Sequence, residues 1–414
     1  MCIFKKEACM DPPGQVLIVA TMDTKNREAV FLRERFKEAG IPVLLLDAGI
    51  RGKSPVPVDI HPEEVAAAGD QTLEAVRNMG HEGKALSAMI KGAVRLAADL
   101  YRQNKIHGVI GLGGSMGTTL GTAVMRSFPI GFPKVMISTM ASRDTRAFVG
   151  TRDICMLHSV CDLSGLNRIT RAVLRNGAMA MAGMLKEMPQ KPPPQKPLAI
   201  LSTLGTTEAC VQQVRQHFEK SGYEVVIFHT VGSGGMAMEE MIQQGNPAAV
   251  IDISLHELAD HLFGGDYDAG PARGMAALQK ESPTVLVPGN IDFLVAGPLQ
   301  AALKLFPGRP YHQHNEAITV LRTDHKEMEI LARKVAERCN AARGPLAILI
   351  PMGGFSAFDS ENGPFPDPGA RDQFAQTLKG HLHETSVLTL LPFHINAPEF
   401  SRSIIQTFEK LCLT

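Results

Sequence analysis

Tryptophan is absent from this 414-residue sequence, and tyrosine occurs only four times. Proteins that bind single-stranded nucleic acid stack the bases on aromatic side chains, so this shortage disfavours that class. An excess of charge of one sign is also missing, because 42 Lys and Arg face 42 Asp and Glu. A chain with a net charge of zero has no overall attraction to nucleic acid or to an anionic membrane surface. We therefore expect neither as a partner.

Long apolar runs are absent too. The longest are Val16 to Ala20, Val43 to Leu46 and Leu346 to Ile350, which is strand length and far below the ~20 residues of a membrane-spanning helix. Residues 1–15 contain no apolar signal-peptide core of ~7–15 residues, and we interpret them as a frayed leader. The seven cysteines form no C-x-x-C pair, which disfavours a disulfide framework or a zinc ribbon. These absences predict a cytoplasmic protein.

One proline-rich segment divides the chain. Residues 189–197 are polar and contain five prolines, a composition typical of an extended, semi-rigid linker. The full length also exceeds the ~100–150 residues of a common single domain. We therefore predict two domains, at residues 16–188 and 198–414.

The two predicted domains begin alike. Each starts with an apolar strand, continues into an amphipathic helix that ends at a glycine, and adds a second apolar strand. An offset of 182 residues superposes three pairs: Thr21 and Thr203, Thr24 and Thr206, Gly40 and Gly222. The match indicates either an internal repeat or two unrelated β-α-β units. Both alternatives predict an α/β fold of two Rossmann-like subdomains, each a mostly parallel sheet covered by helices.

A glycine-rich loop is the sharpest candidate for a ligand site. Gly111-Leu-Gly-Gly-Ser-Met-Gly-Thr118 follows an apolar strand and opens a helix. Backbone N–H groups of such a loop bind phosphate oxygens, and the hydroxyls of Ser115, Thr118 and Thr119 can add donors. The loop matches neither a Walker A motif nor the dinucleotide fingerprint G-x-G-x-x-G. The alternative is a tight turn that needs glycine only for packing.

Polar residues also follow the first predicted strand. Thr21 and Thr24 offer hydroxyls for phosphate, Lys25 can neutralise it, and Asp23 can hold a metal-bound water. The alternative is that Asp23 or Thr24 caps the following helix.

Two further strand ends carry polar residues. Thr139, in the loop after Lys134 to Ser138, can complete a phosphate pocket together with Arg143, although solvated loop polarity explains it equally well. Asp47 ends the second strand, where dinucleotide folds place an acid that binds ribose. Asp47 supports the alternative of an NAD-dependent or sugar-phosphate enzyme. However, the turn after the first strand lacks the glycines that a dinucleotide fold has there.

Glycines and acids at strand ends of the second domain predict a second cleft. Its candidate residues are Gly234, Gly235, Asp252, Glu257, Asp292, His314, Gly353 and Gly354. The pairs His312-x-His314 and His381-x-His383 lack an evident third zinc ligand, so we interpret them as surface histidines. Residues 155–161, which contain two cysteines and a histidine, predict a buried apolar turn. We predict no metal-binding residues.

These loops together resemble a known family. The segments that carry the resemblance are Ala20-Thr-Met-Asp-Thr-Lys25, Gly113-Gly-Ser-Met-Gly-Thr118, Ile137-Ser-Thr-Met-Ala-Ser142, His158-Ser-Val-Cys-Asp-Leu-Ser-Gly-Leu-Asn-Arg168, Phe228-His-Thr-Val-Gly-Ser-Gly-Gly-Met-Ala-Met-Glu239 and Pro351-Met-Gly-Gly-Phe-Ser-Ala-Phe-Asp359. In the same order, they are similar to segments of a largely uncharacterised bacterial and fungal family. That family shares its fold with the N-terminal domain of the plant tobamovirus-resistance protein, which inhibits viral RNA replication.

The resemblance implies two Rossmann-like subdomains, a homodimer, and ATP bound with Mg²⁺ by the first subdomain. It implies nucleotide contacts at the matching positions Thr21, Asp23, Thr24, Lys25, Gly113, Gly114, Ser115, Gly117 and Thr118. Met116 departs from the glycine usual in the family, and Ser254-Leu-His-Glu257 replaces a run of threonines before glutamate.

The sequence therefore predicts a two-domain protein that binds Mg-ATP and an unidentified small molecule. The sequence lacks the His-Glu-x-x-His motif of metalloproteases, and no catalytic residue is predicted. Three alternatives stay open: an enzyme acting on a small or phosphorylated molecule, a non-catalytic dimeric regulator with a structural nucleotide, and an NAD- or sugar-phosphate-dependent enzyme.

Overall fold

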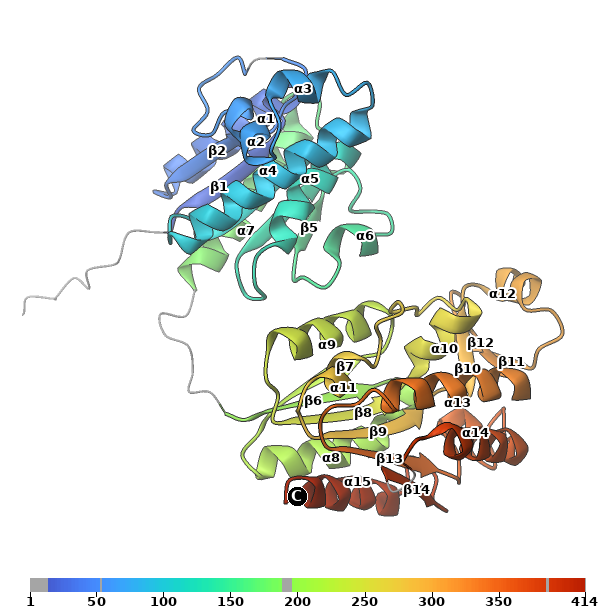
Figure 1. Ribbon diagram of the computed structural model, residues 1–414. Helices are drawn as coiled ribbons and strands as arrows, with labels where there is room; N and C mark the ends of the chain where they lie inside the picture. Colours follow the sequence, from blue (N-terminus) through green and yellow to red (C-terminus); the bar gives the residue numbers. More distant parts are fainter. Residues whose placement is uncertain (1–13, 53, 188–195, 385–386, 414) are drawn as a thin grey trace, which may run out of the picture. The chain divides into compact units, whose positions relative to one another are not determined.

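The computed structural model describes residues 14–52, 54–187, 196–384 and 387–413. The chain forms two compact units, Met1–Pro192 and Pro193–Thr414, and each is built on its own parallel sheet (Figure 1). The predicted α/β fold with two Rossmann-like subdomains is confirmed. The frayed leader predicted at 1–15 and the linker predicted at 189–197 lie almost entirely outside the described residues.

The sheet of the first unit has the strand order β2-β1-β3-β4-β5, and each neighbouring pair is parallel. The chain runs from β1 to β2 on one side and resumes with β3 on the other. Ligands of open α/β sheets bind outside the carboxyl ends of the strands at such a switch point. The strands are β1 (Val16–Ala20), β2 (Val43–Asp47), β3 (Gly108–Gly113), β4 (Lys134–Ser138) and β5 (Cys155–His158).

Helices cover both faces of this sheet, which explains why its inner strands β1 and β3 are buried and apolar throughout. Along β1, Val16 and Ile18 pack with α1 and α7, whereas Leu17 and Val19 pack with α4 and α5. The alternation follows from the two-residue period of a strand. The helices are α1 (Met22–Glu38), α2 (Pro62–Ala68), α3 (Leu73–Arg77), α4 (Glu82–Arg102), α5 (Ser115–Arg126), α6 (Arg146–Val149) and α7 (Arg168–Lys186).

The second unit has a larger parallel sheet, in the order β14-β13-β9-β8-β6-β7, and a small antiparallel sheet, β10-β12-β11. The strands of the large sheet are β6 (Leu198–Thr203), β7 (Glu224–His229), β8 (Ala249–Ser254), β9 (Thr284–Gly289), β13 (Leu346–Pro351) and β14 (Leu388–Leu391). Those of the small sheet are β10 (Phe293–Ala296), β11 (Tyr311–Gln313) and β12 (Thr319–Arg322).

In the second unit, at least one helix lies between each two consecutive strands of the large sheet, as parallel pairing requires. The helices are η1 (Gly205–Thr207), α8 (Glu208–Lys220), α9 (Ser233–Gln244), α10 (His256–Phe263), α11 (Ala276–Gln279), α12 (Leu299–Leu305), α13 (His325–Cys339), η2 (Ala357–Asp359), α14 (Pro368–His381) and α15 (Pro398–Leu411). Within the described ranges, no helix is both long enough and apolar enough to cross a membrane.

The two units share the arrangement of their first four strands. The order β7-β6-β8-β9 repeats the order β2-β1-β3-β4, and β6 and β7 fall at the predicted offset from β1 and β2. Gly40 and Gly222 follow α1 and α8 with φ of +70° and +88°, the left-handed conformation that ends a helix. This agreement supports an internal repeat.

Candidate functional site

The predicted glycine loop joins β3 to α5 at the switch point of the first sheet. Gly114 is the N-cap of α5, and the helix begins at Ser115. The first N–H groups of a helix have no partner within it, and both Ser115 and Met116 are exposed. This helix end therefore presents free donors and the positive end of the helix dipole to solvent.

The three central glycines of the loop have different roles. Gly113 has φ of +156°, and a Cβ there would lie 2.8 Å from Cα of Gly117. A Cβ on Gly117 would lie 2.9 Å from the carbonyl oxygen of Leu112, so both glycines are required by packing. Gly114 has an ordinary φ of −80°, and the nearest atom to an added Cβ would be Thr139 Oγ1 at 3.8 Å. Packing therefore does not require glycine at position 114.

Thr21 to Lys25 follow β1, which is the direct neighbour of β3 in the sheet. The hydroxyls of Thr21 and Thr24 lie 3.1 Å apart, and Thr21 is the N-cap of α1 without a side-chain cap. Lys25 leaves helical geometry inside α1, with φ of −121° and ψ of 21°. Among the residues that the structure describes, its ammonium group has no hydrogen-bond or ion-pair partner. It is thus available to an anion at this edge of the sheet.

The two acids of this edge are engaged with the backbone. Asp23 Oδ2 accepts N–H groups of Ile50 and Arg51 at 3.1 and 2.9 Å, which fixes the loop after β2. Asp47 is buried, and its Oδ1 accepts N–H groups of Met22 and Gly49 at 3.0 and 2.7 Å. Burial raises the pKa of Asp47. Asp47 therefore braces α1 and its own loop, which removes the feature that favoured an NAD-dependent enzyme.

Thr118 and Thr139 differ in their surroundings. The buried hydroxyl of Thr118 donates to the carbonyl oxygen of Gly114 at 2.7 Å and shares a 2.6 Å hydrogen bond with Ser138. Its N–H also donates to Gly114, at 2.8 Å. Thr118 thus ties α5 to β4 and has no donor left for the predicted ligand contact. Thr139 is half-buried, and its N–H donates to the carbonyl oxygen of Gly113 at 3.2 Å, so its hydroxyl lies next to the loop.

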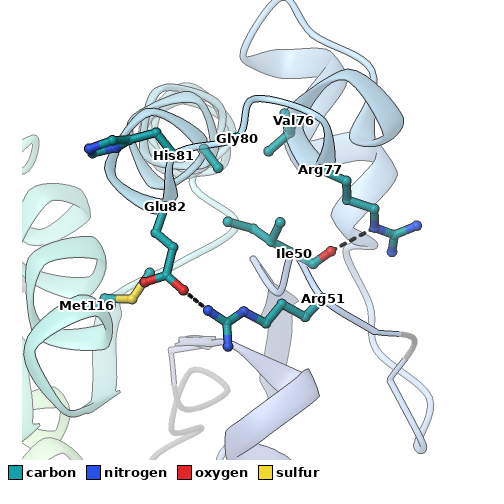
Figure 2. A pocket seen from close by; sticks show the side chains of 9 residues that line it. Ile50, Arg51, Val76, Arg77, Gly80, His81, Glu82 and Met116 are labelled. Atoms are coloured by element: carbon teal, nitrogen blue, oxygen red, sulfur yellow. Dashed lines mark hydrogen bonds and ion pairs between the residues drawn. The ribbon is translucent and has the colours of Figure 1, made fainter.

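A cavity of about 400 Å³ lies beside the glycine loop (Figure 2). Its walls come from the loop after β2, the end of α3, the start of α4 and the first turn of α5, and they comprise Ile50, Arg51, Val76, Arg77, Gly80, His81, Glu82, Ala85 and Met116. Met116 therefore lines a cavity next to the tight turn. The volume is typical of small-molecule sites. No sequence motif marks this cavity, because four separate segments contribute one to four residues each.

In the second unit, the predicted cleft residues Asp252 and Glu257 belong to a buried ionic cluster. Arg273 is fully buried and donates to Asp252 at 2.7 and 2.8 Å and to Glu257 at 2.7 Å. Glu239 lies 3.4 Å from the same guanidinium and accepts the N–H of Gly274 at 2.6 Å. Burial raises the pKa of Glu239 and Glu257 above the ordinary range.

Gly234 and Gly235 are packing glycines. A Cβ on Gly235 would lie 1.9 Å from Glu257, and one on Gly234 would lie 1.7 Å from the carbonyl oxygen of His229. The Glu257 carboxylate accepts the N–H groups of Gly232 and Gly235 at 2.6 and 2.9 Å, so it occupies the position that a bound anion would take. These contacts do not support the predicted second cleft at this loop.

The other predicted residues of that cleft do not join the cluster. His314 is exposed beyond β11. A Cβ on Gly353 or Gly354 would meet His394, at 2.4 and 2.6 Å. Asp292 is fully buried and accepts a 2.6 Å hydrogen bond from the Ser356 hydroxyl.

Asp292 should make stability depend on pH. Burial, and secondarily the charge of Asp359, raise its pKa from 3.8 to about 6. Between these values the folded protein binds more protons than the unfolded chain, so the free energy of unfolding should fall as pH rises from about 4 to about 6. Asp292→Asn cannot ionise, so it should lose this slope and exceed the parent in stability above pH 6.

Urea denaturation at several pH values checks this expectation. Exposed Asp144, whose pKa Arg146 lowers to about 2, provides the control Asp144→Asn, which should keep the slope. Parallel pH profiles for the parent and Asp292→Asn would contradict the assignment.

Comparison with known proteins identifies relatives along the whole chain. The models of the N-terminal and C-terminal domains of the "Uncharacterised protein family (UPF0261)" match residues 14–190 and 196–412. UPF0261 proteins of Clostridium tetani and Rhizobium meliloti are each 34% identical over 96% of this chain and 99% of their own length.

A plant protein and a more distant structure also match. The ToMV resistance protein Tm-1(GCR237) of Solanum lycopersicum is 32% identical over 95% of this chain and 55% of its own length. The resemblance predicted from the sequence motifs is thus confirmed. A crystal structure of UDP-N-acetylglucosamine 2-epimerase covers 94% of both chains with a TM-score of 0.23 and 10% identity, a similarity too low to carry an argument about the site.

Proposed function

The chain belongs to the uncharacterised protein family UPF0261, and we propose that its first unit binds Mg-ATP at the carboxyl edge of β1 and β3. One observation carries the proposal: the free N–H groups at the start of α5 and the unpaired ammonium of Lys25 follow neighbouring strands at the switch point. Helix N-termini and lysine are both common phosphate ligands. Gly114 leaves the space that a phosphate needs.

The residues at this edge fit a Mg²⁺ ion that arrives with the nucleotide. Nowhere in the described part of the chain do three His, Cys, Asp or Glu residues gather as a metal site. Mg²⁺ typically takes one or two carboxylates, several waters and the phosphates of its nucleotide. Asp23 uses one oxygen for backbone N–H groups and offers the other, and the hydroxyls of Thr21 and Thr24 lie nearby. When bound, the ion would neutralise phosphate charge.

Ligand binding is tested by thermal unfolding with Mg-ATP. A ligand at about 100 times its Kd adds ~2.7 kcal/mol to the stability of the folded state, so the unfolding transition of the first unit should shift upward. Absence of a shift with any nucleotide at millimolar concentration would overturn the proposal. Turnover of ATP by the same preparation then separates an enzyme from a non-catalytic regulator. The homodimer and the cytoplasmic location remain predictions, which sedimentation and cell fractionation test.

Lys25→Ala should weaken Mg-ATP binding about 10- to 150-fold, because it removes a charge-assisted contact worth ~1.5–3 kcal/mol. Lys37 is exposed near the other end of α1, so Lys37→Ala is the matched control and should bind like the parent. Titration calorimetry measures both. Equal affinities for the two variants would place the phosphates away from Lys25.

A further inference from the structure

The cavity beside the glycine loop combines apolar walls with a charged rim. Ile50, Val76 and Met116 contribute apolar side chains, and Arg51 forms an ion pair with Glu82 of α4 (Figure 2). Met116 belongs to the first turn of α5. The cavity is thus continuous with the helix end at which we place the phosphates.

We infer that this cavity holds the purine base of the bound nucleotide, with apolar side chains against the faces of the ring and the Arg51–Glu82 pair at its edge. This inference rests on the proposed function and adds the ligand class that the site selects. If the phosphates bind the N–H groups at the start of α5, the nucleoside of the same ligand lies next to Met116. Met116 lines this cavity, so the base can enter it.

The shape and chemistry of the cavity suit a base better than a second anion. Its volume of about 400 Å³ lies within the ~300–1,000 Å³ of typical small-molecule sites, which have mostly apolar walls and a few polar groups. A guanidinium beside a carboxylate offers donors next to an acceptor. The edges of adenine and guanine carry the complementary pattern, since both present donors next to acceptors.

The ion pair between Arg51 and Glu82 at the rim can open to bind a ligand at little cost in free energy, whereas the backbone of the loop that carries Ile50 and Arg51 is held in place. The Arg51 and Glu82 side chains are 68% and 63% exposed, and an exposed ion pair contributes little to stability. The backbone of the same loop is held at two points: Asp23 accepts N–H groups of Ile50 and Arg51, and Arg77 donates to the carbonyl oxygen of Ile50 at 2.7 Å. Such a preorganised wall favours binding because little ordering remains to be done.

In the second unit, a buried glutamate side chain occupies the position that corresponds to this cavity. Met116 is the second residue of the helix after the third strand, and Glu257 is its counterpart in α10. Glu257 reaches the loop after β7, the counterpart of the loop after β2, and its carboxylate is bound there by backbone N–H groups and Arg273. Buried ion pairs thus replace the cavity. We therefore expect one nucleotide per chain.

The test compares Mg-ATP with inorganic tripolyphosphate plus Mg²⁺, which carries the phosphates without a base. In the parent, ATP and GTP should bind at least tenfold more tightly than tripolyphosphate, and more tightly than CTP. Met116→Ala should reduce the affinity for ATP roughly five- to tenfold, since it removes apolar contact with the ring. The affinity of the same variant for tripolyphosphate should stay within about twofold of the parent's. Met184 has similar exposure on α7, so Met184→Ala is the control and should change neither.

The outcomes separate this inference from the proposed function. Failure of both ATP and tripolyphosphate to bind would overturn the phosphate site itself. Equal binding of ATP and tripolyphosphate by the parent, or equal weakening of both by Met116→Ala, would overturn only the base site. Glu82→Ala supplies a second readout, because loss of the acceptor should narrow the preference for ATP over tripolyphosphate. An unchanged preference would count against the Arg51–Glu82 rim.

Discussion

Replacing Gly114 by valine is expected to weaken Mg-ATP binding by roughly 100-fold or more, at least ~2.7 kcal/mol, while the first unit stays folded. The backbone at Gly114, with φ of −80° and ψ of −156°, accepts a β-branched residue. An added Cβ would have no neighbour closer than 3.8 Å. Its methyl groups would instead lie in front of the N–H groups of α5 and keep phosphate away. Titration calorimetry measures the loss, and circular dichroism checks the fold.

Gly205 provides the matched control for this substitution. It begins η1 after the first strand of the second unit, and an added Cβ there would meet nothing within 4 Å. Gly205→Val should therefore leave Mg-ATP binding unchanged. If Gly114→Val binds Mg-ATP as tightly as Gly205→Val, the glycine loop is only a packing turn and the nucleotide binds elsewhere.

Replacing Arg273 by methionine is expected to reduce the free energy of unfolding of the second unit by ~3–5 kcal/mol. Removing one partner of a buried ion pair leaves the others unpaired in a medium of low polarity. Here Asp252 and Glu257 would both lose the guanidinium that lies 2.7 Å from each carboxylate. Hydrogen exchange should show faster exchange in β8 and α9, which carry Asp252 and Glu239, and unchanged exchange in the first unit.

Arg215 supplies the comparison for Arg273. It pairs with Glu219 at 2.7 Å on the surface of α8, and both side chains are 44% exposed. Arg215→Met should therefore reduce the free energy of unfolding of the second unit by at most ~0.5 kcal/mol. A loss for Arg273→Met no larger than that for Arg215→Met would show that the cluster does not stabilise the second unit.

Patterns confined to a few neighbouring residues were sufficient to predict the architecture. The apolar runs of β1 and β2 and the left-handed glycine after α1 are local features, and an amphipathic helix between two apolar strands leads to a parallel sheet. The position of the glycine loop was predicted for the same reason. Residues 155–161 were predicted wrongly as a buried turn: residues 155–158 form β5, an edge strand, and Cys155 is exposed. The antiparallel sheet β10-β12-β11 was not predicted, because its strands are only three or four residues long.

The sequence by itself thus determined the α/β class, the parallel strands and the glycine turn that opens α5. Only the tertiary structure decided which of the candidate side chains face a ligand. Asp47 and Thr118 look like ligand contacts in the sequence, yet both are buried and bonded within the protein. Glu257 fills one glycine loop because Arg273, sixteen residues away, meets it in the folded unit. Strand and helix patterns depend on near neighbours, whereas burial and the pairing of charges depend on residues that folding brings together from distant segments.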